Sequence, residues 1–111
     1  MLELSPQQMK TVEKLFEAGF RPIAIPLYEN ALCITRGECV AVLSPAAGAG
    51  LRLVAQPSYL VDGNPGVRLK RAAGEVFVWK KKEIPATAER LAELELFRKD
   101  LAELLEGAPI Q

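Results

Sequence analysis

Few residues in this chain could carry chemistry. There is no histidine, and the two cysteines are Cys33 and Cys39. The missing imidazole excludes the commonest general base and metal ligand, together with Ser-His and Cys-His nucleophiles. Two cysteines cannot close a structural zinc site. We therefore expect a protein that is not an enzyme and that holds neither a metal nor another cofactor.

The two cysteines flank a predicted turn. Alternating apolar residues predict a β-hairpin over residues 31–43, turning at Gly37. A two-residue loop would pair Ile34 with Cys39, whereas a three-residue loop with a glycine bulge would set Cys33 opposite Cys39. We prefer the second register because it gathers the larger aliphatic side chains on one face: Leu32, Ile34, Val40 and Val42. It predicts a thiol pair across the hairpin, which we expect to stay reduced rather than to form a redox disulfide.

Basic side chains gather in one segment of a chain whose net charge is zero. Between residues 66 and 82 there are six cations and one acid, Glu75, which gives a local charge of +5. The candidate anion contacts are Arg68, Lys70, Arg71, Lys80, Lys81 and Lys82. They fall at opposite ends of a second predicted hairpin, so we expect two small solvated patches rather than a nucleic-acid groove. Weak binding of an anion or nucleic acid is the third functional hypothesis.

Aromatic side chains occur beside these cations. The second hairpin covers residues 67–80, and a three-residue loop over 72–74 would pair Leu69 with Phe77. That register puts one apolar set on a shared face, which we expect to be core: Val67, Leu69, Phe77 and Trp79. Alternatively, an apolar pocket between the sheet and the helices would be lined by Phe16, Tyr59, Phe77, Trp79 and Phe97. Empty space beside Trp79 would favour the pocket.

One helix is expected at each end of these hairpins. Ser5 and the three residues after it are typical of a capping box, and helical spacing predicts a helix over residues 6–18 that stops at Gly19. Thr87 is the expected N-cap of a final helix of about 19 residues, which Gly107 ends. The apolar residues of this helix form one broad stripe: Leu91, Leu94, Phe97, Leu101, Leu104 and Leu105.

The whole pattern predicts a single α+β domain over residues 1–111. We expect an antiparallel meander sheet of about five or six strands with both helices on one face, and a proline-containing edge strand or connection over residues 21–27. In outline this layout resembles profilin-like sandwiches and PH-like barrels with a C-terminal helix. No apolar run approaches the ~20 residues of a membrane span. The first residues lack the pattern of a signal peptide, so we expect a cytoplasmic protein without a membrane partner.

Apolar surface outside the core is the main functional clue. A sheet covered on one side leaves its other face partly apolar, and Leu96 lies on the outer side of the final helix. We expect a homodimer, or a complex with another protein, formed through the outer sheet face and the edge near residues 22–26. The predicted function is a small non-enzymatic protein-binding or assembly module. The alternative is a regulatory domain that binds a small ligand in the apolar pocket.

Overall fold

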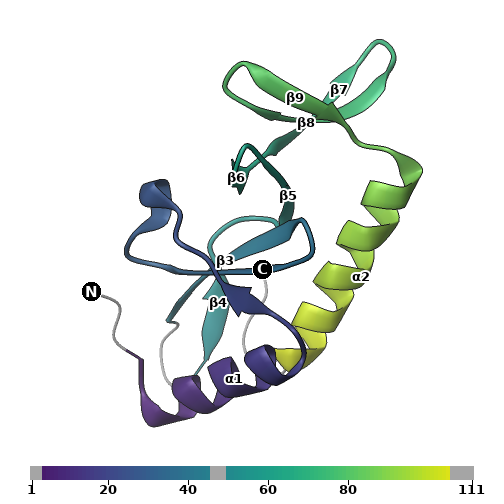
Figure 1. Ribbon diagram of the computed structural model, residues 1–111. Helices are drawn as coiled ribbons and strands as arrows, with labels where there is room; N and C mark the ends of the chain where they lie inside the picture. The colour runs from purple at the N-terminus through teal and green to yellow at the C-terminus, as the bar shows by residue number, and fades with distance from the viewer. Residues whose placement is uncertain (1–3, 46–49, 106–111) are drawn as a thin grey trace.

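The computed structural model describes residues 4–45 and 50–105, which form two helices and two antiparallel sheets (Figure 1). The α+β fold class is therefore confirmed. The helices are α1 (Pro6–Glu17) and α2 (Ala88–Leu104), and a short 3-10 helix, η1, covers Pro26–Tyr28. The strands are β1 (Arg21–Pro22), β2 (Leu32–Arg36), β3 (Cys39–Pro45), β4 (Leu51–Leu53), β5 (Ser58–Val61), β6 (Asn64–Pro65), β7 (Val67–Arg71), β8 (Gly74–Trp79) and β9 (Lys82–Pro85).

Helix α1 starts with the predicted capping box. The Ser5 hydroxyl accepts the backbone N–H of Gln8 at 3.2 Å, and the Gln8 side chain accepts the N–H of Ser5 at 2.8 Å. At the other end Gly19 has a φ of +96°, which only glycine adopts without strain. Local sequence therefore sets both ends of this helix.

Helix α2 presents the predicted apolar stripe to the core. The Thr87 hydroxyl caps it by accepting the N–H of Arg90 at 3.2 Å. The side chains buried along the stripe are Leu94, Phe97, Leu101 and Leu105. Leu96, on the outer side, is 57% exposed, as its position on the helical wheel predicts. Gly107, the expected stop, lies outside the described residues.

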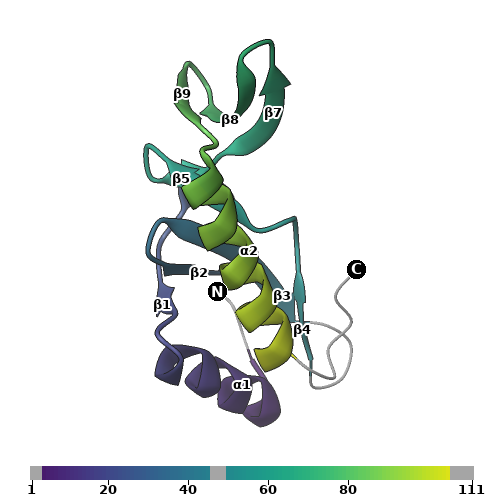
Figure 2. The same cartoon turned by 90° about the vertical axis from the view of Figure 1, so that its right-hand side faces the viewer.

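Six strands form the larger sheet, in the order β1-β2-β3-β5-β6, with β4 also paired to β3. Both helices pack on one face of it, as predicted, and the main core lies between (Figure 2). The opposite face is covered by the segment around η1, where Ile25 packs against Cys33, Val40 and Val42. This sheet is therefore buried on both faces at its centre. We call the sheet with its two helices the body.

The predicted register of the first hairpin is wrong. Arg36 pairs with Cys39 and Ile34 with Ala41 across a two-residue loop, in which Gly37 has a φ of +64°. Cys33 lies opposite Val42 instead of Cys39. The size of the aliphatic side chains could not select the register because both faces of this hairpin are buried.

The predicted register of the second hairpin is also wrong. Its loop is Ala72–Ala73, so Leu69 pairs with Val76 and Arg68 with Phe77. A slip of one residue moves a whole strand's side chains to the other face. Val67 and Leu69 consequently share a face with Val76 and Val78, and not with Phe77.

The second hairpin belongs to a separate three-stranded sheet, β7-β8-β9, which we call the distal sheet. Strand β9 was not predicted, and the turn before it is Lys80–Lys81, with Lys80 at a φ of +54°. The distal sheet lies at the end of an elongated molecule, far from α1 (Figure 1). Neither α1 nor α2 is both long and apolar enough to cross a membrane.

Candidate protein-interaction surface

The face of the distal sheet that points away from the body is apolar and uncovered. We define this open face by the four aliphatic side chains of the β7–β8 ladder: Val67, Leu69, Val76 and Val78. Val67 is 56% exposed and Leu69 is 38% exposed, while the two valines of β8 are half-buried. Large apolar side chains that lie together on a surface are typical of contact sites.

Charged groups border the open face without crossing it. Arg71 and Glu83 point to the same side as the aliphatic residues, since Arg71 continues the alternation of β7 and Glu83 pairs with Val78. Their side chains form an ion pair, with Arg71 Nη2 3.2 Å from a Glu83 carboxylate oxygen. An apolar centre with a polar rim is the usual anatomy of a protein interface.

The inner face of the distal sheet is fixed to the body by aromatic packing. Phe77 is fully buried and stacks on Tyr59 of β5 with ring centroids 5.5 Å apart. Trp79 and Ile84 pack against the same core. Because alternate side chains of β8 point in opposite directions, this anchoring turns Val76 and Val78 outward.

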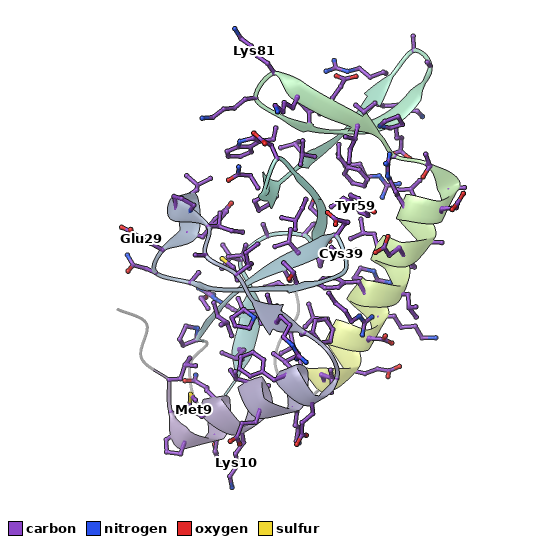
Figure 3. The ribbon with its side chains drawn as sticks, viewed as in Figure 1. Met9, Lys10, Glu29, Cys39, Tyr59 and Lys81 are labelled. Atoms are coloured by element: carbon purple, nitrogen blue, oxygen red, sulfur yellow. The ribbon has the colours of Figure 1, made fainter. Side chains whose placement is uncertain are left out.

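The six predicted anion contacts are not gathered into one site. Arg68 is paired with Glu75 at 2.7 Å, Arg71 with Glu83, and Lys82 with Asp62 at 3.7 Å. The Arg68 guanidinium lowers the pKa of the Glu75 carboxyl. Lys80 lies over the Trp79 ring, and Lys81 points away from the molecule at the tip of the β8–β9 turn (Figure 3). Lys70 is exposed on β7 and has no ion-pair partner among the described residues.

The five residues of the predicted pocket all belong to the main core: Tyr59, Phe77 and Phe97 are buried in it, and Phe16 and Trp79 pack against it. Phe97 packs edge-on against Phe20 at 5.2 Å between ring centroids, Phe16 belongs to α1, and Trp79 packs on the core. A half-open groove of about 490 Å³ lies elsewhere, between α2, the segment 55–58 and the start of β7. Phe77 is the one member of the predicted set among the residues that line this groove. Its apolar lining includes Pro57, Leu91 and Leu94.

The predicted thiol pair is wrong, because the two cysteines lie on opposite faces of the larger sheet. Cys33 packs under η1, whereas Cys39 belongs to the main core beside Tyr59 (Figure 3). Burial raises the pKa of both thiols, and it raises that of Cys39 to about 12, with a further contribution from the nearby Glu93 carboxylate. Both cysteines are therefore small buried apolar groups with little thiolate at neutral pH.

Polar contacts between α2 and the larger sheet were not predicted. The Tyr59 hydroxyl donates to Glu93 at 3.1 Å, and burial together with this bond raises the pKa of Tyr59. Arg36 pairs with Asp100 at 2.7 Å and lies 4.6 Å from the centre of the Phe20 ring. No motif in the sequence marks Glu93 or Asp100 among the other charged residues of this helix. These contacts hold the helix against the first hairpin.

Comparison of the chain with protein-family models, curated proteins and solved structures finds no match. Within the described residues, no three acidic or cysteine side chains lie close enough together to hold a metal ion. The function is therefore inferred from the shape and chemistry of the surface.

Proposed function

We propose that this protein is a small protein-binding module whose contact surface is the open face of the distal sheet. The observation that carries the proposal is the position of Val67 and Leu69, which the register places beside Val76 and Val78 on an uncovered sheet face. Burying such a face against a partner would remove apolar area from water at roughly 25 cal/mol per Å².

The electrostatics of the distal sheet favour this function over nucleic-acid binding. Three of the six candidate cations are already paired with carboxylates. Phe77 is buried and Trp79 is half-buried, so neither ring offers the exposed stacking platform that single-stranded nucleic acids use. We expect weak retention on a polyanion column.

The experiment that tests the proposal combines capture with a measured affinity. The protein is used as bait in an extract of the cells that produce it, and each captured protein is then purified and titrated against the wild type by calorimetry. A double variant, Val67→Thr with Leu69→Thr, keeps the β-propensity of β7 but makes its open-face side chains polar. We expect this variant to weaken the complex at least about tenfold, since central apolar contacts dominate interface energies.

The matched control is Leu96→Gln, which also makes an exposed leucine polar but lies on α2. It should change the affinity less than about twofold, because residues outside the contact are near neutral. Equal losses for the two variants, unchanged binding by the double variant, or no partner at all would each contradict the proposal.

Self-association stays a prediction with its own test. Light scattering after size exclusion gives about twice 12.1 kDa for a homodimer and 12.1 kDa for a monomer. If a dimer forms through the open face, the Val67→Thr, Leu69→Thr variant returns it to the monomeric mass. A dimer that resists this variant uses another surface.

The groove favours a second candidate function, the regulatory binding of a small ligand. Its volume lies in the usual range for ligand sites, and Phe77 and Leu94 give it an apolar floor. Leu94→Trp would fill part of this space. A thermal-shift screen in which a compound stabilises the wild type but not Leu94→Trp would support this function, and a screen without such a compound would contradict it.

A further inference from the structure

We propose that the partner of this protein supplies an extended segment of alternating acidic and apolar residues, which joins the distal sheet as a fourth strand along β7. This inference rests on the proposed function and names the chemistry of the partner. Three observations carry it: the open edge of β7, its basic side chains, and the groove at its start.

Strand β7 is the longest of the described strands that lie at a sheet edge. Strand β7 pairs only with β8, and all five of its residues are exposed. Proteins blunt sheet edges with short strands and with proline. Among the other described strands at a sheet edge, β1 and β6 have two residues each and contain Pro22 and Pro65, β4 has three residues, and β9 ends in Pro85. Strand β7 has five residues and no proline, so it can accept backbone hydrogen bonds along about 17 Å.

The side chains of β7 set the chemistry of an added strand. Neighbours across a sheet sit on the same face, so alternate residues of the new strand lie beside Arg68 and Lys70, and the others lie beside Val67 and Leu69. Arg68 is already paired with Glu75, whereas Lys70 has no ion-pair partner among the described residues, so an acidic side chain on the added strand complements Lys70. Apolar side chains extend the open face. Alternating acidic and apolar residues therefore satisfy both faces at once.

The same charges exclude a second copy of this chain from the edge. Antiparallel self-pairing centred on Leu69 would set Arg68 of each copy opposite Lys70 of the other. Like charges directly opposite each other destabilise a sheet. Basic residues on β7 therefore protect the edge from self-aggregation while leaving it open to an acidic segment.

The groove gives the added strand a place to continue. Gly66, Val67 and Arg68, at the start of β7, are among the residues that line it, together with Phe77, which lies on the same face as Arg68. The floor formed by Phe77 and Leu94 suits a bulky apolar side chain at the end of the segment. A strand beside a helix-lined groove is a known way for proteins to recognise extended peptides, in which backbone bonds give affinity and pockets give specificity.

The test uses three synthetic peptides with blocked ends and a fluorescent label. The first alternates valine with glutamate over eight residues and ends in phenylalanine. The second has the same composition with its glutamates and valines in separate blocks, and the third replaces glutamate with lysine. Anisotropy titrations of the purified protein should show the alternating acidic peptide binding at least about tenfold more tightly than either control. Hydrogen exchange followed by NMR should show slower exchange of the β7 amides at saturation.

Variants locate the contact on β7. Lys70→Glu should weaken the acidic peptide at least about tenfold and improve binding of the lysine peptide, because the charge pairing is reversed. Lys81→Glu makes the same charge change at the far turn and should alter affinity less than about threefold. Residue 70 pairs with Glu75 across the hairpin, so a glutamate there would set two like charges opposite each other. Lys70→Gln is therefore included as a milder variant, and circular dichroism checks that each variant is folded.

Several outcomes would overturn the inference. If the block and alternating peptides bind with equal affinity, the attraction depends on charge alone. Equal losses of peptide affinity in Lys70→Glu and Lys81→Glu would lead to the same conclusion. Absence of peptide binding at millimolar concentration would exclude strand addition. If a captured partner still requires Val67 and Leu69 but ignores Lys70→Glu, the open face binds protein in another way, and the proposed function stands without this inference.

Discussion

The body and the distal sheet differ in how the apolar faces of their strands are covered. In the body, the central strands β2 and β3 are buried on both faces, by the helices on one side and by the η1 segment on the other. In the distal sheet, one face packs on the body through Phe77, and the opposite face remains open. The body can stabilise itself, whereas a three-stranded sheet with one bare apolar face gains from a partner. This difference places the candidate function at one end of the molecule.

The largest expected contrast comes from truncating a buried ring in the body. Phe97 is buried between α2 and the core and packs on Phe20, so Phe97→Ala should lower the free energy of unfolding by about 3–5 kcal/mol. Leu69→Ala on the open face should cost about 1 kcal/mol or less, since Leu69 is 38% exposed and buries much less apolar area than Phe97. Urea denaturation measures both. Similar losses would mean that the open face is buried in solution.

The junction between the two regions should tolerate no added methyl group. A Cβ at Gly66 would lie 2.7 Å from the Val61 side chain and 3.1 Å from both the Tyr59 carbonyl oxygen and Phe77 Cβ. We expect Gly66→Ala to cost about 1–3 kcal/mol, because backbone and buried rings cannot move aside. Thermal unfolding gives the value.

The control for the junction is Gly63→Asn, in the neighbouring turn. Gly63 has a φ of +76° and open space around it, and asparagine adopts this conformation readily. It should cost less than about 0.5 kcal/mol. A Gly66→Ala protein as stable as the control would show that the junction is loosely packed.

Alkaline pH should lower the free energy of unfolding because Cys39 is buried in the body. Its folded pKa of about 12 lies above the ordinary 9.0, so below pH 9 both folded and unfolded chains keep the proton and this contribution is complete. As the pH rises from about 9 towards 12, the unfolded chain loses the proton first and stability falls, by about 1.4 kcal/mol per pH unit at most.

A matched variant isolates this effect from other titrations. Cys39→Ala should be less stable than the wild type near neutral pH, but between pH 8 and pH 10 it should lose about 1 kcal/mol less than the wild type. Denaturation curves at the two pH values measure the difference. Parallel losses in the two proteins would contradict the assigned pKa shift.

The smallest contrast concerns ion pairs. Asp100→Asn breaks the half-buried pair with Arg36 in the body and should cost about 1 kcal/mol. Glu83→Gln breaks the more exposed pair with Arg71 and should cost about 0.5 kcal/mol or less, with most of that lost in high salt. Denaturation at low and high salt separates the two. A larger loss of stability for Glu83→Gln than for Asp100→Asn would contradict this prediction.

The sequence predicted the parts that depend on local chemistry. The capping residues Ser5 and Thr87 and the apolar stripe of α2 set the helices as expected. The strand at residues 21–22 is an edge, as its proline implies. Each of these features depends on residues close together in the chain, which is why a single sequence is enough to find them.

Hairpin register was not predictable because it depends on what covers each face. In the first hairpin both faces are apolar, so side-chain alternation does not choose between registers. In the second, grouping Val67 with Phe77 assumed that the apolar residues of β7 belong to the core. The structure instead leaves Val67 and Leu69 partly exposed to solvent. Because of that assumption, Val67 and Leu69 were not assigned to the candidate interaction surface from the sequence.

Trp79 gives the boundary between the two regions an optical signal. It is the only tryptophan of the chain, it packs against the body from the inner face of the distal sheet, and the Lys80 ammonium lies 5.7 Å from its ring centre. Indole emission depends on solvent and on nearby charge. Unlabelled protein can therefore report, in a stopped-flow fluorimeter, whether the distal sheet shifts on the body when a ligand arrives, and how fast it does so.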